Sequence, residues 1–171
     1  IFNLENALKH VNGDYIFLSD QDDVWLPNKI STCLLYLRDY DLLISDAVVV
    51  DSDDNLIYSS FFEINHTKIG KVYNLIHNGY LGCCMCLNRK LLLNILPFPK
   101  NIPMHDIYIG NYANFNHFNV LFIKDKLINY RRHGNNASIA SEKSTRKMIL
   151  RIKDRIEIIS SCILHRSEMS T

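Results

Sequence analysis

The stretch "DYIFLSDQDDVWLPNKI", residues 14–30, joins a short apolar run to a dense group of acids. Its first part, "DYIFLS", predicts a short buried strand, and Asp20, Asp22 and Asp23 come directly after that strand. Pro27 is typical of the first turn of a helix, so a helix is expected on the far side of the acids. In layered α/β domains ligands bind beyond the carboxyl ends of strands, which is where these acids fall.

Outward from this stretch, apolar patterns of helical and strand type alternate. Helices are expected over residues 3–13, from Pro27 onward, and over 71–80, 89–96 and 107–115; strands over 41–51, 56–62, 81–88 and 120–133. In the helix after Pro27, we expect Ile30, Leu34 and Leu37 to share the buried face. This alternation predicts an α/β domain with a mostly parallel sheet flanked by helices.

The composition indicates a soluble, globular protein. Of 171 residues, 47% are apolar and 22% charged, and a net charge of +1 argues against a nucleic-acid binder. No apolar run approaches a membrane span, and the first residues do not form a signal peptide, so we expect a cytoplasmic location. The five cysteines lack a second ligand pair at zinc spacing and are predicted to be reduced and buried.

Crowded carboxylates repel one another, and a divalent cation is the simplest compensation. Mg²⁺ and Mn²⁺ prefer oxygen ligands, so the acid cluster predicts a site for one of them. The alternatives are a solvated acidic turn, or Asp23 capping the next helix. The later "DSDDN", residues 51–55, resembles a calcium loop but lacks its glycine, and we interpret it as a turn.

"DQDDV" also fits the pattern of haloacid-dehalogenase-like phosphatases. In that reading Asp20 is the nucleophile and Asp22 the acid/base, with Ser45 and Lys90 as partners. That family also needs a later acidic pair at a strand end, where this sequence offers only Asp125. This hypothesis is therefore incomplete.

Four motifs in order resemble a more specific family: "GDYIFLSDQDDVW", "YLGCCMCLNRKLL", "PMHDIYIG" and "YRRHGNNAS". Together they are similar to the catalytic part of inverting family-two glycosyltransferases with the GT-A fold. The greatest similarity is to bacterial rhamnosyltransferase-like enzymes of surface-polysaccharide synthesis. The resemblance covers residues 1–141 and implies a nucleotide-sugar donor, with rhamnose from a dTDP donor as the expectation, and a saccharide or lipid-linked acceptor.

The resemblance assigns donor and metal roles to charged residues. It implies that Asp22 is the metal ligand, that Asp20 lies nearer the nucleotide ribose and that Asp23 supports them. His133 matches a late histidine that approaches the metal or the diphosphate. The neighbouring Arg131 and Arg132 are predicted to bind phosphate, because guanidinium groups suit it.

The resemblance also implies a base and an acceptor pocket. Asp106 stands where the family places the base that takes the acceptor hydroxyl's proton; by itself it is also a plausible helix N-cap. The preceding His105 departs from the expected acid or small polar residue, which leaves open whether it positions the acceptor or raises the pKa of Asp106. Gly82 is expected to let the backbone approach the donor. Trp25 is a candidate for stacking on a sugar, with core packing as the alternative.

The sequence lacks the apolar strand and "PTYN"-like turn with which family members begin, and it has no initiator Met. We therefore expect a fragment or a truncated gene product, inactive by itself; a non-catalytic remnant is the remaining alternative. Residues 142–171 predict a basic helical tail, whose apolar face consists of Ile149, Ile152, Ile156, Ile159 and Ile163. That face packs on the domain or lies on the inner face of an anionic membrane.

Overall fold

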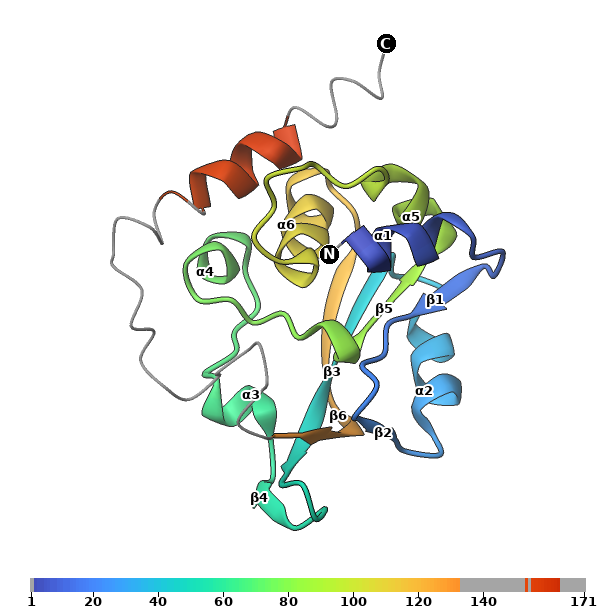
Figure 1. Cartoon of the computed structure of the whole chain (residues 1–171), viewed down its shortest axis with the longest axis vertical. Coiled ribbons are helices and arrows are strands. Elements are labelled where there is room, and N and C mark those ends of the chain that lie inside the picture. The colour runs from blue at the N-terminus through green and yellow to red at the C-terminus, as the bar shows by residue number, and fades with distance from the viewer. Residues whose placement is uncertain (1, 133–152, 154, 164–171) are drawn as a thin grey trace.

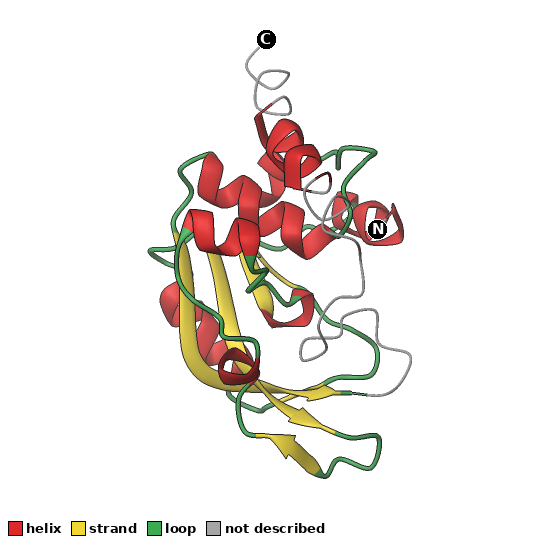
Figure 2. Ribbon diagram, turned by 90° about the vertical axis from the view of Figure 1, so that its left-hand side faces the viewer, coloured by secondary structure: helices red, strands yellow, loops and turns green. Residues whose placement is uncertain are grey.

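Most of the predicted helices and strands are present, but β2 was not expected, and residues 61–62 and 82–84 are helical where strands were predicted. The computed structural model describes residues 2–132, 153 and 155–163 (Figures 1 and 2). The helices are α1 Phe2–Lys9, α2 Lys29–Tyr36, α3 Phe61–Ile64, α4 Lys71–Ile76, α5 Arg89–Ile95 and α6 His105–Phe115, with a 3₁₀ turn, η1, over Gly82–Cys84. The strands are β1 Tyr15–Phe17, β2 Val24–Trp25, β3 Leu42–Val50, β4 Leu56–Tyr58, β5 Met85–Asn88 and β6 Val120–Arg131. A further helix covers residues 155–163.

The strands form one mixed sheet in the order β1-β5-β3-β6-β2, with β4 paired to β3. The expected mixture of helices and sheet is confirmed, but the expectation of mostly parallel pairing is wrong. Among the described strands only β3 and β6 pair in parallel; the other pairings are antiparallel. The reason is that β5 inserts between β1 and β3. β1 and β3 run in the same direction but do not pair with each other. Which strands become neighbours in the sheet is a long-range property, and the order of strands and helices along the chain does not predict it.

This topology collects several loops at one edge of the sheet. β1, β3 and β6 all end there, because β1 and β3 share a direction and β3 runs parallel to β6. β5 runs the opposite way, so η1, which precedes it, lies at the same edge. β2 is antiparallel to β6, and the acid-rich loop before β2 therefore meets the end of β6.

Each face of the sheet carries its own apolar core. The smaller core lies under α2, where Cys33 and Leu37 pack with Leu43 and Leu127. The larger one lies between the sheet and the other helices, and Figure 1 shows α2 on one side of β3 and α4 on the other. Of the predicted apolar set, Leu37 is buried and Leu34 half-buried, but Ile30 is 49% exposed; Lys29 and Cys33 are the buried residues within α2. The helix is thus rotated by about one residue from the expected orientation.

The helix over residues 155–163 packs on the domain. Ile158 and Cys162 are buried, whereas Ile156 and Ile163 of the predicted face are more than half exposed. The Arg155 guanidinium donates hydrogen bonds to the carbonyls of Leu75, at 2.9 Å, and Ile76. The predicted apolar face is therefore wrong in this part, while Ile149 and Ile152 lie outside the described residues. No helix in the described ranges has both the length and the apolar character to cross a membrane.

Candidate active site

The acid cluster lies at the carboxyl edge of the sheet, in the loop between β1 and β2. Asp20 is exposed, and Asp23 is half-buried. One carboxylate oxygen of Asp23 accepts a hydrogen bond of 3.0 Å from the backbone amide of Arg131, at the end of β6. Its other carboxylate oxygen is buried and accepts no hydrogen bond from a nitrogen or oxygen donor within the described part of the chain, although the Cys83 thiol interacts with this carboxylate. An unsatisfied buried carboxylate oxygen is costly, so a bound cation would stabilise this arrangement.

Three side chains at this edge bring metal-ligand atoms within 4.8 Å of one another: Asp20, Asp23 and Cys83. Partial desolvation raises the pKa of Asp20, and repulsion from Asp23 and Asp22 adds to this increase. Burial likewise raises the pKa of Asp23. Hydrogen bonds from the thiol of Cys83 and the amide of Arg131 lower this pKa, but burial has the larger effect. Both shifts show that negative charge is crowded here, and a cation would relieve the crowding.

The donor set favours an oxygen-binding metal. The contact with Cys84, together with burial, raises the pKa of the Cys83 thiol well above its usual value. Mg²⁺ and Mn²⁺ prefer oxygen ligands to sulfur, so with either ion Cys83 would be a neighbour of the site rather than a ligand. Two carboxylates with open positions fit Mg²⁺ or Mn²⁺, which substrate phosphates and water complete.

The structure therefore brings Asp20 and Asp23 together in a group that could hold a cation, whereas the ligand that the resemblance implied is Asp22. Asp22 lies in the same loop, half-buried, but does not belong to the group of three. The second implied ligand, His133, lies outside the described residues.

Gly82 joins the acid cluster to the start of α6. A Cβ atom at this glycine would stand 2.8 Å from Nε2 of His105 and 3.8 Å from Cβ of Asp106. The absent side chain therefore makes room for the imidazole, and it lets η1 approach the first turn of α6. The immediate neighbour of Gly82 is thus His105, and the predicted approach of its backbone to the donor stays a prediction.

Asp106 is a buried acid beside the cluster. It is 5% exposed and lies in the first turn of α6, where its carboxylate accepts a 2.7 Å hydrogen bond from the amide of Ile107. The N-cap position belongs to Met104, so the capping role suggested by the sequence is wrong. Burial raises the pKa of Asp106 to about 6, and the charge of Asp20 contributes to this shift. A carboxylate with such a pKa is ionised at neutral pH and is a stronger base than an ordinary aspartate.

His105 precedes Asp106 and is half-buried against Gly82. Burial lowers the pKa of its imidazole, so the ring is neutral at pH 7. A neutral imidazole can donate one hydrogen bond and accept another, which suits contact with a sugar hydroxyl.

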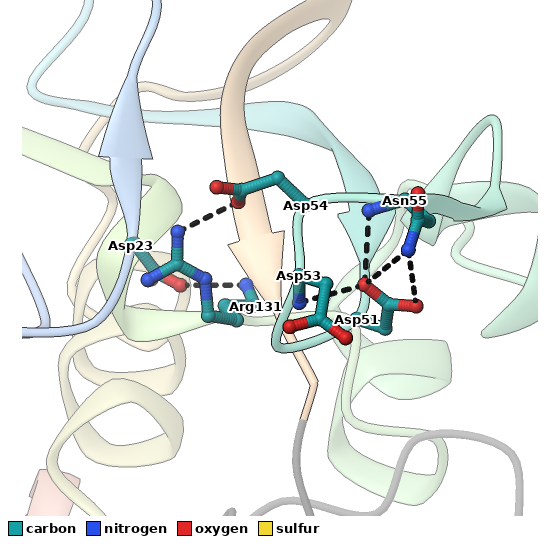
Figure 3. A network of polar contacts seen from close by, with 6 residues as sticks. All are labelled: Asp23, Asp51, Asp53, Asp54, Asn55 and Arg131. Carbon is teal, nitrogen blue, oxygen red and sulfur yellow. Dashed lines mark hydrogen bonds and ion pairs between the residues drawn. The ribbon is translucent and has the colours of Figure 1, made fainter.

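Arg131 ties the acid cluster to the turn after β3. Its guanidinium forms an ion pair of 2.6 Å with Asp54, while its backbone amide holds Asp23 (Figure 3). The turn is the one predicted from "DSDDN": one oxygen of Asp51 accepts from the amides of Asp53, at 2.8 Å, and Asn55, at 2.9 Å. Arg132 follows, and its amide donates to the carbonyl of Val50. Both predicted phosphate-binding arginines thus stand at the edge that carries the acids.

Lys29 is the residue of this site that sequence reasoning missed. It is fully buried, and its ammonium donates a 3.3 Å hydrogen bond to the carbonyl of Cys83 in η1. The same ammonium lies 5.2 Å from the centre of the Trp25 ring. Trp25 also packs on Phe17, with ring centres 5.9 Å apart, which supports the core-packing alternative for this residue. Only the position "PNK" after the acids hinted that a lysine could reach this loop.

The phosphatase hypothesis loses its partner residues. Lys90 lies 3.4 Å from Asp41, just before the amino end of β3, whereas Asp20 lies at the opposite edge of the sheet. Ser45 is buried in the middle of β3. Neither side chain reaches Asp20, so the structure contradicts this alternative.

The comparisons with known proteins agree with this arrangement. The family model described as "Glycosyl transferase family 2" matches residues 3–96, more than half of the chain. A search of curated proteins finds no match. The matched range includes the acid cluster and Gly82 and ends before His105. The chain belongs to glycosyl transferase family 2, and its activity is glycosyl transfer.

Proposed function

We propose that the protein transfers a sugar from a nucleotide-diphosphate donor to a saccharide or lipid-linked acceptor, with inversion and with help from Mg²⁺ or Mn²⁺. The observation that supports this best is the proximity of two kinds of carboxylate at one sheet edge. Asp20 and Asp23 form a crowded, partly unsatisfied pair, and the buried Asp106 is close enough to Asp20 for their charges to interact.

The proposed roles follow from this division. Asp20 and Asp23 would hold the cation, whose chemistry is to stabilise negative charge on the departing diphosphate. Asp106 takes the proton of the acceptor hydroxyl as the oxygen–carbon bond forms and the bond between the sugar carbon and the phosphate oxygen breaks. His105 orients the acceptor through its neutral ring, and Gly82 leaves space for both. Rhamnose as the donor sugar rests on the sequence resemblance alone.

Calorimetry with a nucleoside diphosphate tests the metal site without requiring turnover. Binding should need Mn²⁺ or Mg²⁺ and should be lost in both Asp20→Asn and Asp23→Asn. Asp22→Asn distinguishes the ligand implied by resemblance from the pair favoured by geometry. The exposed Asp39 supplies the control, as Asp39→Asn. Metal-independent binding, or none at all, would count against the proposal and favour a non-catalytic protein.

A further inference from the structure

A cavity of about 470 Å³ lies apart from the acid cluster, between α3 and the middle of β3 and β6. Its charged lining consists of Lys68, Lys124, Lys126, Glu63, Asp46 and the titratable His66. The lining thus includes three lysines, and nothing in the proposed reaction uses them.

A bulge in β6 brings two of these lysines to the cavity. The register between β3 and β6 runs from Ser45 opposite Ile123 to Asp46 opposite Lys126. Lys124 and Asp125 therefore have no partner residue on β3. Bulges of this kind redirect side chains and are enriched near functional sites. Lys124 and Lys126 are both exposed, and neither ammonium has an ion-pair partner among the described residues.

The acids of the cavity offset only part of the positive charge of the lysines. Asp46 is 3% exposed, and its carboxylate accepts hydrogen bonds from the Ser60 hydroxyl, at 2.6 Å, and the amides of Ala47, at 2.8 Å, and Phe62, at 2.9 Å. These bonds stabilise the buried carboxylate and fix α3 on β3. Glu63 is then the one exposed acid of the lining, against three exposed lysines. The cavity thus presents an excess of positive charge, which favours an anion.

The cavity lies on the same side of the sheet as α6. Phe62 contacts Phe122, and Phe122 contacts Tyr80, whose hydroxyl is hydrogen-bonded to Asn114 of α6. Asp46 precedes Val50, the partner of Arg131, by four residues of β3, or about 13 Å at the usual rise of a strand. A ligand group in the cavity is therefore separate from a diphosphate held by the acid cluster.

We propose that this cavity binds an anionic group, a phosphate or a carboxylate, carried by the acceptor. The binding of the anion rests on the cavity itself, whereas its attachment to an acceptor rests on the proposed function. An acceptor anchored in the cavity would be held at two points, at the base and at the cavity.

The test is a titration of the full, ¹⁵N-labelled chain by NMR, without metal or nucleotide. Methyl phosphate and glucuronate are the two probes, so that the phosphate and carboxylate sources are distinguished. Amide shifts around the cavity should change with at least one probe. In Lys124→Gln/Lys126→Gln the affinity should fall about fivefold or more, because two ion pairs are lost. Lys100→Gln, at an exposed site away from the cavity, should bind normally.

Shifts that are absent with both probes, or unchanged in the double variant, would overturn the proposal. Failure of the donor-site calorimetry leaves this titration unaffected, because neither probe requires the acid cluster or a metal. The two proposals therefore fail separately.

Discussion

The backbone amide of Arg131 donates a 3.0 Å hydrogen bond to the carboxylate of Asp23, 108 residues earlier in the chain. This bond links the end of β6 to the acid-rich loop. The guanidinium of the same arginine forms an ion pair with Asp54, in the turn between β3 and β4 (Figure 3). One residue thus contacts acidic side chains of two loops at the edge where the acids gather.

Asp23 should therefore have separable structural and metal-binding roles. Asp23→Asn keeps an oxygen for the Arg131 amide but removes the charge, so metal-dependent nucleotide binding should be lost while the protein stays stable. Asp23→Ala removes both, and should also lower the free energy of unfolding by about 1–2 kcal/mol. Calorimetry and urea unfolding of the two variants measure the difference. Equal stability of both variants would show that the hydrogen bond contributes nothing.

Asp106→Asn should slow sugar transfer about 10²–10⁴-fold, the usual contribution of a general base. Donor affinity should hardly change, because the base acts on the acceptor hydroxyl. Single-turnover transfer and donor calorimetry separate these quantities. Near-normal transfer by the variant would exclude Asp106 as the base.

The raised pKa of Asp106 makes two pH predictions. The rate should fall as pH drops below about 6, because the base becomes protonated. Folding is affected in the opposite sense. The pKa of Asp106 is about 6 in the folded protein, against the usual 3.8, so the folded state binds the proton more tightly than the unfolded state does. The free energy of unfolding therefore increases as pH falls from about 6 towards 4, and decreases as pH rises through the same range.

Asp106→Asn should consequently stabilise the metal-free protein by about 1–3 kcal/mol at pH 7, since the buried charge is removed. The gain should disappear below pH 4, where the native carboxyl is neutral in both states. Urea unfolding at both pH values, with a chelator present, measures this. A variant that is less stable at pH 7 would show that the charge is compensated in the fold.

Gly82→Ala should fold but displace His105, because the new Cβ would lie 2.8 Å from Nε2 of the ring. We expect weaker acceptor use, seen as a higher KM for the acceptor. In a His105→Ala background the same glycine change should have little further effect. If the two substitutions raise the KM for the acceptor additively, the effect of Gly82→Ala does not come from its contact with His105.

Lys29→Met tests the buried lysine. Methionine keeps the apolar stem, but it leaves the carbonyl of Cys83, the residue of η1 beside Asp20 and Asp23, without its donor, so η1 should shift next to the acids. We expect weaker metal-dependent nucleotide binding, and Lys100→Met serves as the control for loss of a lysine. Unchanged binding, measured in variants confirmed as folded by circular dichroism, would limit Lys29 to a packing role.

The sequence by itself determined the local features of this protein. The acids after β1, most of the helices and strands and the turn at residues 51–55 all follow from short-range patterns. Such patterns work because side-chain period, capping and backbone freedom depend on neighbours in the chain.

Only the tertiary structure decided which segments meet. The insertion of β5 between β1 and β3, the contact of Arg131 with Asp23 and the approach of His105 to Gly82 join residues far apart in sequence. The burial of Lys29 likewise depends on how α2 rotates against the sheet, since its apolar stem packs while its ammonium finds the Cys83 carbonyl. Pairing and packing of this kind are set by the whole core, so no local stretch of the sequence contains them.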